Sequence, residues 1–356
     1  MSGTERVTTS KHGATTTPII ELDHVSQIFG TKSGAVHAVN DVSLTIVPGA
    51  VLCLVGESGS GKTTTAKMIA GLRPPTSGQL RYNGRDVAGL KGDALAEFRR
   101  AVQIIHQDPY ASLNPIRTIY QTLSAPLLKH KIVPNQRAAE ERATELLALV
   151  GLTPPANFLH LYPHNLSGGQ RQRVSIARAL TLNPRVIVAD EAVSMIDVSL
   201  RVSILNLLLK LREELDVTFL FITHDLAIAK YFAWTGHIGV MYLGRLVEYG
   251  RTPGMIAEPN HPYTRALLAA IPEPDPDLAR AKEGLRLRSA DIPSLLRLPS
   301  GCTFHPRCPL WEEGLCDQVA PELVQIAEGR YTACHVIARE RIGTIATVAD
   351  ATAAAD

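Results

Sequence analysis

Short apolar runs separated by polar and glycine-containing segments recur along the chain and predict buried strands. The runs with the length of a strand are Val51–Val55, Val102–Ile105, Val186–Ala189 and Phe219–Ile222. Ile19–Phe29 is predicted to form a further strand, and the alternation of apolar and polar residues in Val42–Ile46 predicts another. Asn83-Gly84 marks a tight hairpin turn.

Helical patterns lie between these runs. Thr64–Ala70 follows the first run and is predicted to be helical, with Gly71 in place to end the helix. Residues 116–150 look mainly helical, and Asn135–Val150 has the clearest amphipathic pattern. The dipeptide Pro154-Pro155 then breaks the helical pattern.

Composition and charge narrow the class of protein only a little. The 356 residues are 45% hydrophobic and 20% charged, which is ordinary for a globular protein with one large domain and a smaller one. The net charge of +2 gives no reason to expect nucleic acid as a partner. No apolar run is long enough to cross a bilayer, and the N-terminus has no apolar signal core. We therefore expect a cytoplasmic protein that meets a membrane only through a partner.

A glycine-rich segment follows the run Val51–Val55. It consists of Gly56, Glu57, Ser58, Gly59, Ser60, Gly61, Lys62 and Thr63 and fits the phosphate-loop pattern G-x-x-x-x-G-K-[ST] at every fixed position. Glycines let backbone N–H groups close around phosphate oxygens, and a helix N-terminus adds partial positive charge. We expect Lys62 to reach the outer phosphates of a nucleotide and the Thr63 hydroxyl to ligate Mg²⁺. The alternative is a chance glycine turn, and the agreement of pattern and context counts against it.

Polar residues follow the other three apolar runs at the point where each run ends. Asp190 is suited to hold Mg²⁺ through water, and Glu191 is suited to orient or deprotonate an attacking water. A solvated acidic strand end is the alternative for this pair. Gln107 taken alone reads as a loop residue, although from a strand end it can reach metal or water. His224 lies at the same predicted edge and can donate to a γ-phosphate, whereas a lone histidine is more often structural.

A second potential phosphate site precedes a helical pattern later in the chain. Its residues are Leu166, Ser167, Gly168, Gly169 and Gln170. Free N–H groups at a helix entry and the Ser167 hydroxyl suit an anion. Ser-Gly-Gly alone is a weak signal, because many loops contain it, but its place between the phosphate loop and the acidic strand end strengthens it.

With these motifs in order, the chain resembles the nucleotide-binding subunit of ATP-binding cassette (ABC) transporters over roughly residues 19–255. The resemblance implies an α/β fold of the P-loop NTPase type. Its parts would be a RecA-like α/β core, an antiparallel β subdomain, an α-helical signature subdomain and a small cysteine-containing C-terminal extension. The implied boundaries are a disordered tail at 1–17, the cassette at 18–258, the extension at 259–340 and a flexible tail at 341–356.

The resemblance also implies a role for each motif residue. Phe29 would stack on adenine, and Gly56 to Thr63 with Thr64 would bind ATP. Gln107 would contact Mg²⁺ and face the membrane partner, and Asp190 and Glu191 would be the Walker B aspartate and the catalytic glutamate. Leu166 to Gln170 would be the signature, Asp197 the D-loop aspartate and His224 the switch histidine. Glu191, His224 and Gln107 would then form the catalytic group. Two positions depart from the family pattern: Ala192 replaces a proline, and Ser194-Met195-Ile196-Asp197 replaces Ser-Ala-Leu-Asp. They bear on the geometry of the dimer contact and leave the chemistry intact.

The C-terminal part narrows the subfamily. His261–Leu268, Pro272-Glu273-Pro274 and Gly301–Pro309 look like the extension of oligopeptide/dipeptide importer ATPases. Such relatives import peptides, nickel or oligosaccharides with two integral-membrane permeases and an external binding protein, and peptide is the expected cargo. The resemblance places the chain at the cytoplasmic face of a bacterial or archaeal cell membrane.

Five cysteines divide into two groups. Cys53 lies in a predicted buried strand and is expected to be a core residue. Cys302, Cys308, Cys316 and Cys334 follow the spacing C-x5-C-x7-C-x17-C. Four thiolates can hold a [4Fe–4S] cluster or a zinc ion, and relatives with this pattern carry the cluster. The spacing lacks short C-x2-C pairs, which favours iron–sulfur over zinc, and free thiols are the third alternative.

The chain contains only one set of motifs. In the family, ATP is bound between the Walker A loop of one cassette and the signature of another. The resemblance therefore implies a second ABC ATPase as a partner, and a heterodimer with a paralogue is expected. Three rival classes fit less well. Soluble cassettes of DNA repair or translation usually have two cassettes or a coiled-coil insertion, and this chain has neither. P-loop switches and kinases lack the signature, and regulatory cassettes lose Glu191 or His224, whereas all of these are present here.

Overall fold

Residues 17–32, 34–271 and 286–342 are described in a computed structural model of the chain. The predicted tails at 1–17 and 341–356 fall almost entirely outside these ranges, as does Pro272-Glu273-Pro274. A four-stranded antiparallel sheet comes first, with the strand order β2-β1-β4-β5. Its strands are β1 (Ile20–Thr31), β2 (Gly34–Ile46), β4 (Ser77–Tyr82) and β5 (Arg85–Asp86). Asn83 and Gly84 have positive φ between β4 and β5, which confirms the predicted hairpin.

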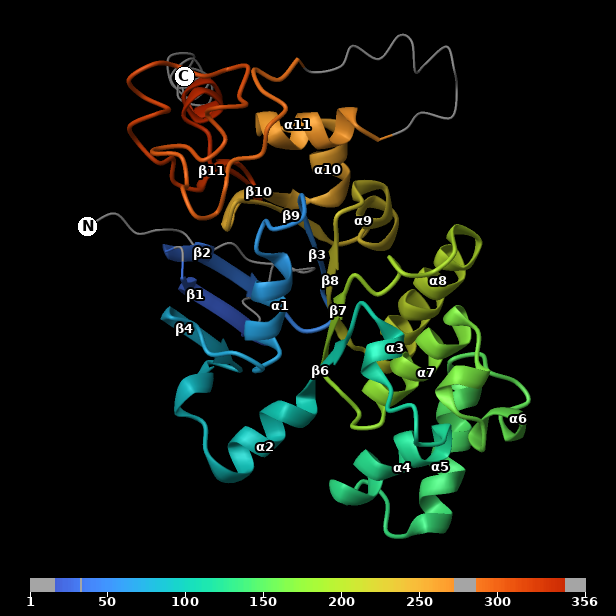
Figure 1. Cartoon of the computed structure of the whole chain (residues 1–356). Coiled ribbons are helices and arrows are strands. Elements are labelled where there is room, and N and C mark those ends of the chain that lie inside the picture. The colour runs from blue at the N-terminus through green and yellow to red at the C-terminus, as the bar shows by residue number, and fades with distance from the viewer. Residues whose placement is uncertain (1–16, 33, 272–285, 343–356) are drawn as a thin grey trace, which may run out of the picture.

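The larger sheet has eight strands in the order β11-β12-β10-β9-β3-β8-β7-β6 (Figure 1). Its parallel strands are β3 (Val51–Val55), β6 (Val102–Ile105), β7 (Val186–Asp190), β8 (Thr218–Thr223) and β9 (His237–Tyr242). The antiparallel strands are β10 (Arg245–Arg251), β11 (Val324–Ala327) and β12 (Arg330–Thr332). Because β12 pairs with β10, the C-terminal part of the chain continues the sheet of the N-terminal part, a connection that the sequence patterns do not predict.

The two faces of the larger sheet bury two hydrophobic clusters. Along β3, Cys53 faces one cluster, whereas Leu52 and Leu54 face the other. This division is expected, because successive side chains of a strand point to opposite faces. One face is covered by α1 (Lys62–Ile69), and the other by α7 (Gly168–Leu180), α8 (Val198–Leu215) and α9 (Leu226–Phe232). Cys53 is fully buried, as predicted for a core residue.

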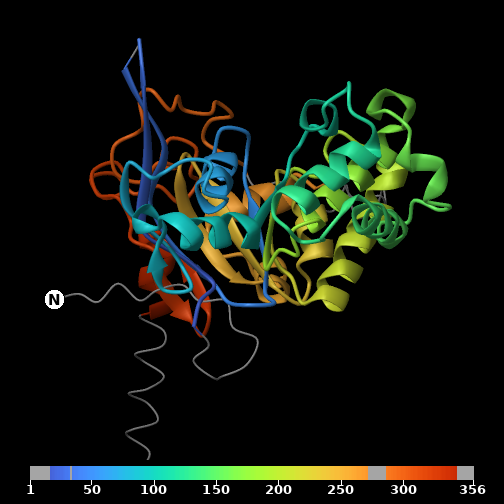
Figure 2. The ribbon, with the colours of Figure 1, turned by 90° about the horizontal axis from the view of Figure 1, so that it is seen from below.

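The helical part lies at one end of the molecule, away from the four-stranded sheet (Figures 1 and 2). It contains α3 (Pro109–Ser112), α4 (Ile119–Lys129), α5 (Gln136–Leu149), α6 (Ala156–Leu159) and the start of α7, which confirms the helical prediction for residues 116–150. The remaining helices are α2 (Gly92–Ala101), α10 (Thr252–Ala257) and α11 (Pro262–Ala269), with short 3-10 helices at Val87–Gly89 and Pro163–Asn165.

The arrangement confirms the expected α/β fold with an antiparallel sheet and a helical part. Within the described ranges, no helix combines the length and the apolar content that crossing a bilayer requires. The parallel strands β3, β8, β7 and β6 are neighbours, so their carboxyl ends share one edge of the sheet. Ligands of open α/β sheets bind at this edge.

Candidate functional site

The phosphate loop joins β3 to α1 in a conformation that only glycine can adopt at two places. Gly56 has φ of 151°, and a Cβ there would lie 2.1 Å from the carbonyl oxygen of Met241. Gly61 has φ of 100°, and a Cβ there would lie 2.3 Å from the carbonyl oxygen of Ala38. Both distances are far below a van der Waals contact. The loop therefore lies between the two sheets, and its backbone packs directly against the backbone of β2 at Ala38 and of β9 at Met241.

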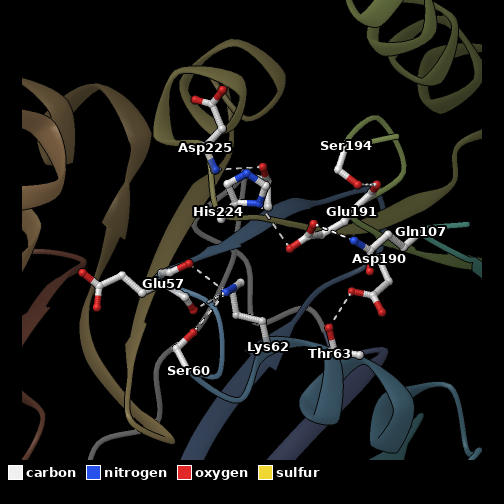
Figure 3. A network of polar contacts seen from close by, with 12 residues as sticks. Glu57, Ser60, Lys62, Thr63, Gln107, Asp190, Glu191, Ser194, His224 and Asp225 are labelled. Atoms are coloured by element: carbon white, nitrogen blue, oxygen red, sulfur yellow. Dashed lines mark hydrogen bonds and ion pairs between the residues drawn. The ribbon is translucent and has the colours of Figure 1, made fainter. Parts of the chain in front are cut away.

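Lys62 is buried at the start of α1 and bridges the loop that precedes it. Its Nζ donates to the carbonyl oxygens of Gly56 at 2.7 Å and Glu57 at 2.8 Å, and to Ser60 Oγ at 3.1 Å (Figure 3). Burial lowers the pKa of Lys62, while the nearby carboxylates, Glu191 first among them, act in the opposite direction. The ammonium group thus occupies a cradle of oxygen atoms at the centre of the loop.

Thr63 and Asp190 meet across the edge of the sheet. The Thr63 hydroxyl donates to Asp190 Oδ1 at 3.0 Å, and Asp190 is the last residue of β7. Burial raises the pKa of Asp190, and the hydrogen bond from Thr63 partly offsets this. A hydroxyl and a carboxylate side by side are hard oxygen donors of the kind that Mg²⁺ binds. The residues present therefore fit a magnesium ion.

Glu191 contacts two of the other predicted polar residues, Gln107 and His224. Gln107 Nε2 donates to Glu191 Oε2 at 3.2 Å, and His224 Nδ1 lies 3.3 Å from Glu191 Oε1 (Figure 3). The backbone of Glu191 has φ of 48°, in the left-handed region. Two hydrogen bonds hold it there: the Glu191 N–H donates to the Ile222 carbonyl oxygen at 3.0 Å, and the Ser194 hydroxyl donates to the Glu191 carbonyl oxygen at 2.9 Å. Strained non-glycine residues of this kind gather at functional sites.

These groups border a cavity of about 530 Å³. It is lined by Ala38, Ser58, Gly59, Ser60, Gly61, Lys62, Thr63, Thr64, Gln107, Glu191, Ser194, Met195, His224 and Leu295. The structure thus brings together the phosphate loop and the ends of β6, β7 and β8, although these lie far apart in the sequence.

Several sequence-predicted residues do not line this cavity: Gly56, Glu57 and Asp190 adjoin its lining residues, and Phe29, the signature and Asp197 are also absent from the lining. Phe29 lies in β1, with the Arg73 guanidinium 4.8 Å from the centre of its ring. Ser167 is exposed at the start of α7, where its Oγ accepts from Gln170 N at 3.3 Å and the Gln170 side chain accepts from Ser167 N at 2.9 Å. Asp197 precedes α8, is exposed and forms no cap bond with its side chain. Ser167 and Asp197 are therefore exposed in the single chain, whereas Leu166 and Gly169 of the signature are buried.

Two residues of the C-terminal part form polar contacts with the phosphate loop, and the sequence patterns predict a role for neither. The Tyr263 hydroxyl accepts from Glu57 N at 2.8 Å, and Arg307 forms an ion pair with the Glu57 carboxylate at 2.9 Å. Both lie in segments quoted for their family resemblance, but no spacing rule links positions 250 residues apart.

The structure does not support the metal site predicted at the four C-terminal cysteines. They are free thiols, and the described residues contain no group of three or more His, Cys, Asp or Glu side chains able to hold a metal ion. Burial raises the pKa of Cys302 to about 11 and that of Cys308 to about 12. Neither an iron–sulfur cluster nor zinc is supported by this arrangement.

A buried lysine in a glycine-rich loop, next to two carboxylates at the edge of a parallel sheet, is the site of a P-loop NTPase. Comparison with known proteins narrows this class. Residues 39–194 match the family described as ABC transporter, and residues 247–316 match the oligopeptide/dipeptide transporter C-terminal region. The chain is 47% identical to a probable peptide ABC transporter ATP-binding protein of Sinorhizobium fredii over 86% of this chain and 85% of that protein. The chain belongs to the ABC transporter family and is an ABC-type ATPase.

Further similarities agree with this assignment. A putative oligopeptide transport ATP-binding protein of Bacillus subtilis is 42% identical over 90% of this chain and 95% of that protein. Among solved structures, a dimeric ATP-binding cassette bound to ADP and phosphate in a post-hydrolysis state is 30% identical, with a TM-score of 0.59, over 65% of this chain and 98% of that one.

Proposed function

We propose that the chain is the ATP-binding and ATP-hydrolysing subunit of an ABC importer that takes up oligopeptides or dipeptides through partner permeases. The cluster of Gln107, Glu191 and His224 beside the phosphate loop carries the hydrolytic part of this proposal. The similarity of residues 247–316 to the oligopeptide/dipeptide region, together with the names of the relatives, supports the cargo. The alternative is the same importer type for oligosaccharides or nickel, or, with less support, a soluble cassette ATPase. The proposed cassette is 18–258 and the proposed extension 259–340.

The proposed division of labour follows from the contacts of each side chain. Lys62 exchanges its carbonyl partners for the outer phosphates of ATP, and backbone N–H groups of the loop up to Thr64 bind the other oxygens. Thr63 and Asp190 would hold Mg²⁺, with Gln107 near them, and the bound ion would supply positive charge for the phosphate oxygens. Glu191 orients the attacking water and accepts its proton.

His224 contacts the γ-phosphate in this proposal and holds Glu191 in place before ATP arrives. Phe29 is proposed to stack on adenine, since its ring already accepts a flat cationic partner in Arg73.

A second cassette is proposed to complete the site. The exposed start of α7, with Ser167, is free to bind a phosphate of another chain. Apolar side chains next to it are unusually exposed: Met195 at 58%, Val198 at 73%, Leu200 at 40% and Val202 at 52%. A Cβ on the signature residue Gly169 would lie 3.0 Å from Leu200, so this apolar patch adjoins the signature. Such a patch beside Asp197 supports a cassette–cassette interface, which we propose to be heterodimeric.

The permeases are proposed to dock near Gln107. A cavity of about 430 Å³ lies beside this strand end, and Gln103, His106, Asn114, Arg117 and Arg178 are among its lining residues. Ile116 is 81% exposed and Tyr110 is 60% exposed on the same segment. Exposed apolar residues around a polar hollow suit a protein partner. Docking of two permeases there would hold the chain at the cytoplasmic face of the membrane, with a substrate-binding protein on the outer side.

The proposed function is tested by purification of the tagged chain from native membranes, with mass spectrometry of the proteins that accompany it. Two permeases, a second cassette ATPase and a substrate-binding protein carrying peptide are expected. Arg117→Glu should release the permeases, because it reverses a charge at the proposed docking cavity. Arg137→Glu is the matched control, since Arg137 is 90% exposed on α5 and does not line that cavity. Recovery of ribosomal or DNA-repair proteins without a permease would contradict the proposal.

A cluster bound by the four cysteines is the least supported part of the proposal. The thiols of Cys302, Cys316 and Cys334 all raise the pKa of Cys308, so the four groups lie within electrostatic range of one another. The lack of a ligating group among the described residues counts against a metal. Iron and sulfide analysis of protein purified without oxygen decides between them: about four irons per chain indicate [4Fe–4S], one zinc indicates the zinc alternative, and a metal-free chain with titratable thiols rejects both.

A further inference from the structure

Every polar group of Glu57, the second residue of the phosphate loop, is bound by another part of the chain. Its N–H donates to the Tyr263 hydroxyl at 2.8 Å, and its carbonyl oxygen accepts from Lys62 Nζ at 2.8 Å. Its carboxylate accepts from both ends of the Arg307 guanidinium, at 2.9 Å from Nη1 and 3.1 Å from Nη2. Two of these three contacts come from the C-terminal part, so that part holds both the backbone and the side chain of one phosphate-loop residue.

The C-terminal part is itself anchored where these contacts arise. The buried carboxylate of Glu248 in β10 accepts from Asn260 N at 2.8 Å and from His261 N at 2.9 Å, just before α11. This fixes the start of α11, and Tyr263 follows in its first turn. The ring of Tyr263 packs against Tyr242, with 4.6 Å between the ring centres. The hydroxyl therefore approaches the loop from a buried and packed side chain.

Arg307 is anchored in the same way. It is 6% exposed, and its Nη1 also donates to the Tyr242 hydroxyl at 3.4 Å. The neighbouring Phe304 packs edge-on against Tyr242, with 5.2 Å between ring centres. A planar guanidinium that grips a carboxylate with both ends fixes its orientation as well as its charge. In Figure 3 the Glu57 carboxylate points away from Lys62.

The negative charge of Glu57 explains why its ion pair with Arg307 bears on nucleotide binding. The loop binds phosphates through its N–H groups and Lys62, and a carboxylate at the second loop position adds one negative charge beside that site. Unpaired, it would repel the nucleotide and compete for Lys62. The ion pair with Arg307 offsets this charge, and the carboxylate is turned away from Lys62.

We propose that Arg307 and Tyr263 are positioning residues of the nucleotide site, through which the C-terminal part sets the affinity of the phosphate loop for ATP. The inference rests on the proposed binding of ATP by the loop. Arg307 neutralises and orients the Glu57 carboxylate, and Tyr263 accepts the Glu57 N–H and so fixes the backbone of the phosphate loop at its second position. Neither residue touches the reacting atoms.

The test compares Arg307→Gln, Glu57→Gln and the double variant as full-length chains, with a fluorescent ATP analogue for affinity and the assembled transporter for ATPase kinetics. Arg307→Gln should raise the Kd and KM for ATP about tenfold, while kcat at saturating ATP changes less than about twofold, because the chemistry lies with other residues. The double variant should bind ATP within about threefold of the unaltered chain, since no unpaired carboxylate remains. A merely structural arginine would not give this rescue.

Arg330→Gln is the matched control. Arg330 joins the C-terminal part to the cassette through Glu258 at 2.9 Å without contacting the loop, and its loss should leave ATP affinity unchanged. Tyr263→Phe keeps the ring and removes only the hydroxyl, so it tests the proposal even where Arg307→Gln fails to fold; a rise of about threefold in Kd is expected. Unchanged affinity in Arg307→Gln or in Tyr263→Phe, or a double variant as weak as Arg307→Gln, would overturn the proposal. Lys62→Ala must weaken binding in either case, and unchanged affinity there would instead refute ATP binding by the loop.

Discussion

The residues around the phosphate loop and those at the start of α7 differ in how they are supported. Asp190 contacts Thr63 and Glu191 contacts Gln107, each from a distant segment of the chain, and Lys62 is held by carbonyl oxygens of its own loop. The Ser167 hydroxyl accepts from Gln170 N, in the same helix turn, and Ser167 is exposed. The carboxyl edge of a parallel sheet brings distant segments together within one chain, whereas a helix end that faces solvent needs a second molecule. The first region is therefore built before assembly, and the second acquires its role through assembly.

The strongest test of the completed region is Glu191→Gln. The amide keeps contacts with Gln107 and His224 but cannot accept a proton, so hydrolysis should fall by about 10² to 10⁴-fold while ATP binding persists. Phosphate release and ATP affinity measure the two properties, and size-exclusion chromatography should show cassettes trapped as a closed pair. Turnover within tenfold of the unaltered chain would exclude Glu191 from the reaction.

Ser167→Arg tests the region that depends on assembly. A long cation at the exposed start of α7 should leave ATP affinity of the isolated chain unchanged, because no residue of the signature lines the cavity of the phosphate loop. ATPase activity of the assembled transporter should fall by about tenfold or more, since the partner's nucleotide loses this contact. Lys62→Ala is the opposite control and should lose affinity in the isolated chain. A Ser167→Arg chain that binds ATP weakly on its own would show that the signature acts within one chain.

The smallest expected effect concerns His261 at the start of α11, where the C-terminal part is anchored. Burial lowers the pKa of His261 to about 3, and its Nδ1 accepts from Tyr263 N at 3.1 Å, so the ring is neutral in the folded chain. An unfolded histidine has a pKa of about 6.5, so the unfolded state binds the proton first as the pH falls. The stability contribution is fully present above pH 6.5 and is lost progressively toward pH 3, by about 2 kcal/mol between pH 7 and 5.

His261→Asn keeps a good helix cap and removes this titration. Urea unfolding of both chains at pH 7 and pH 5 measures the difference. The variant should lose about 2 kcal/mol less than the unaltered chain over this interval. An equal loss in both chains would show that other groups, such as the buried His237 with its pKa lowered to about 4, carry the acid sensitivity.

Local patterns predicted the parts of the molecule that depend on neighbours in sequence. The strand Val51–Val55, the hairpin at Asn83 and the phosphate loop each carry their own signal, and the shared sheet edge then places Asp190 and Glu191 near Lys62. The contacts that escaped prediction join distant segments. Nothing in the sequence pairs β12 with β10, or Arg307 with Glu57.

The predicted cluster lacks support from the structure for a related reason. The spacing of cysteines gives their order along the chain, but whether their sulfur atoms converge depends on how the loops between them pack. The φ of 48° at Glu191 was equally invisible to local patterns, because it is imposed by hydrogen bonds to Ile222 and Ser194.

The pairing of β12 with β10 limits how this protein can be recombined with its relatives. A cassette cut off after residue 258 would expose the edge of β10, with Glu248 and Tyr249 stripped of their covering residues, and open strand edges promote aggregation. A chimera that takes its C-terminal part from another ATPase would need a matching charge at both position 57 and position 307. The boundary seen in sequence families is thus not a place where the molecule comes apart.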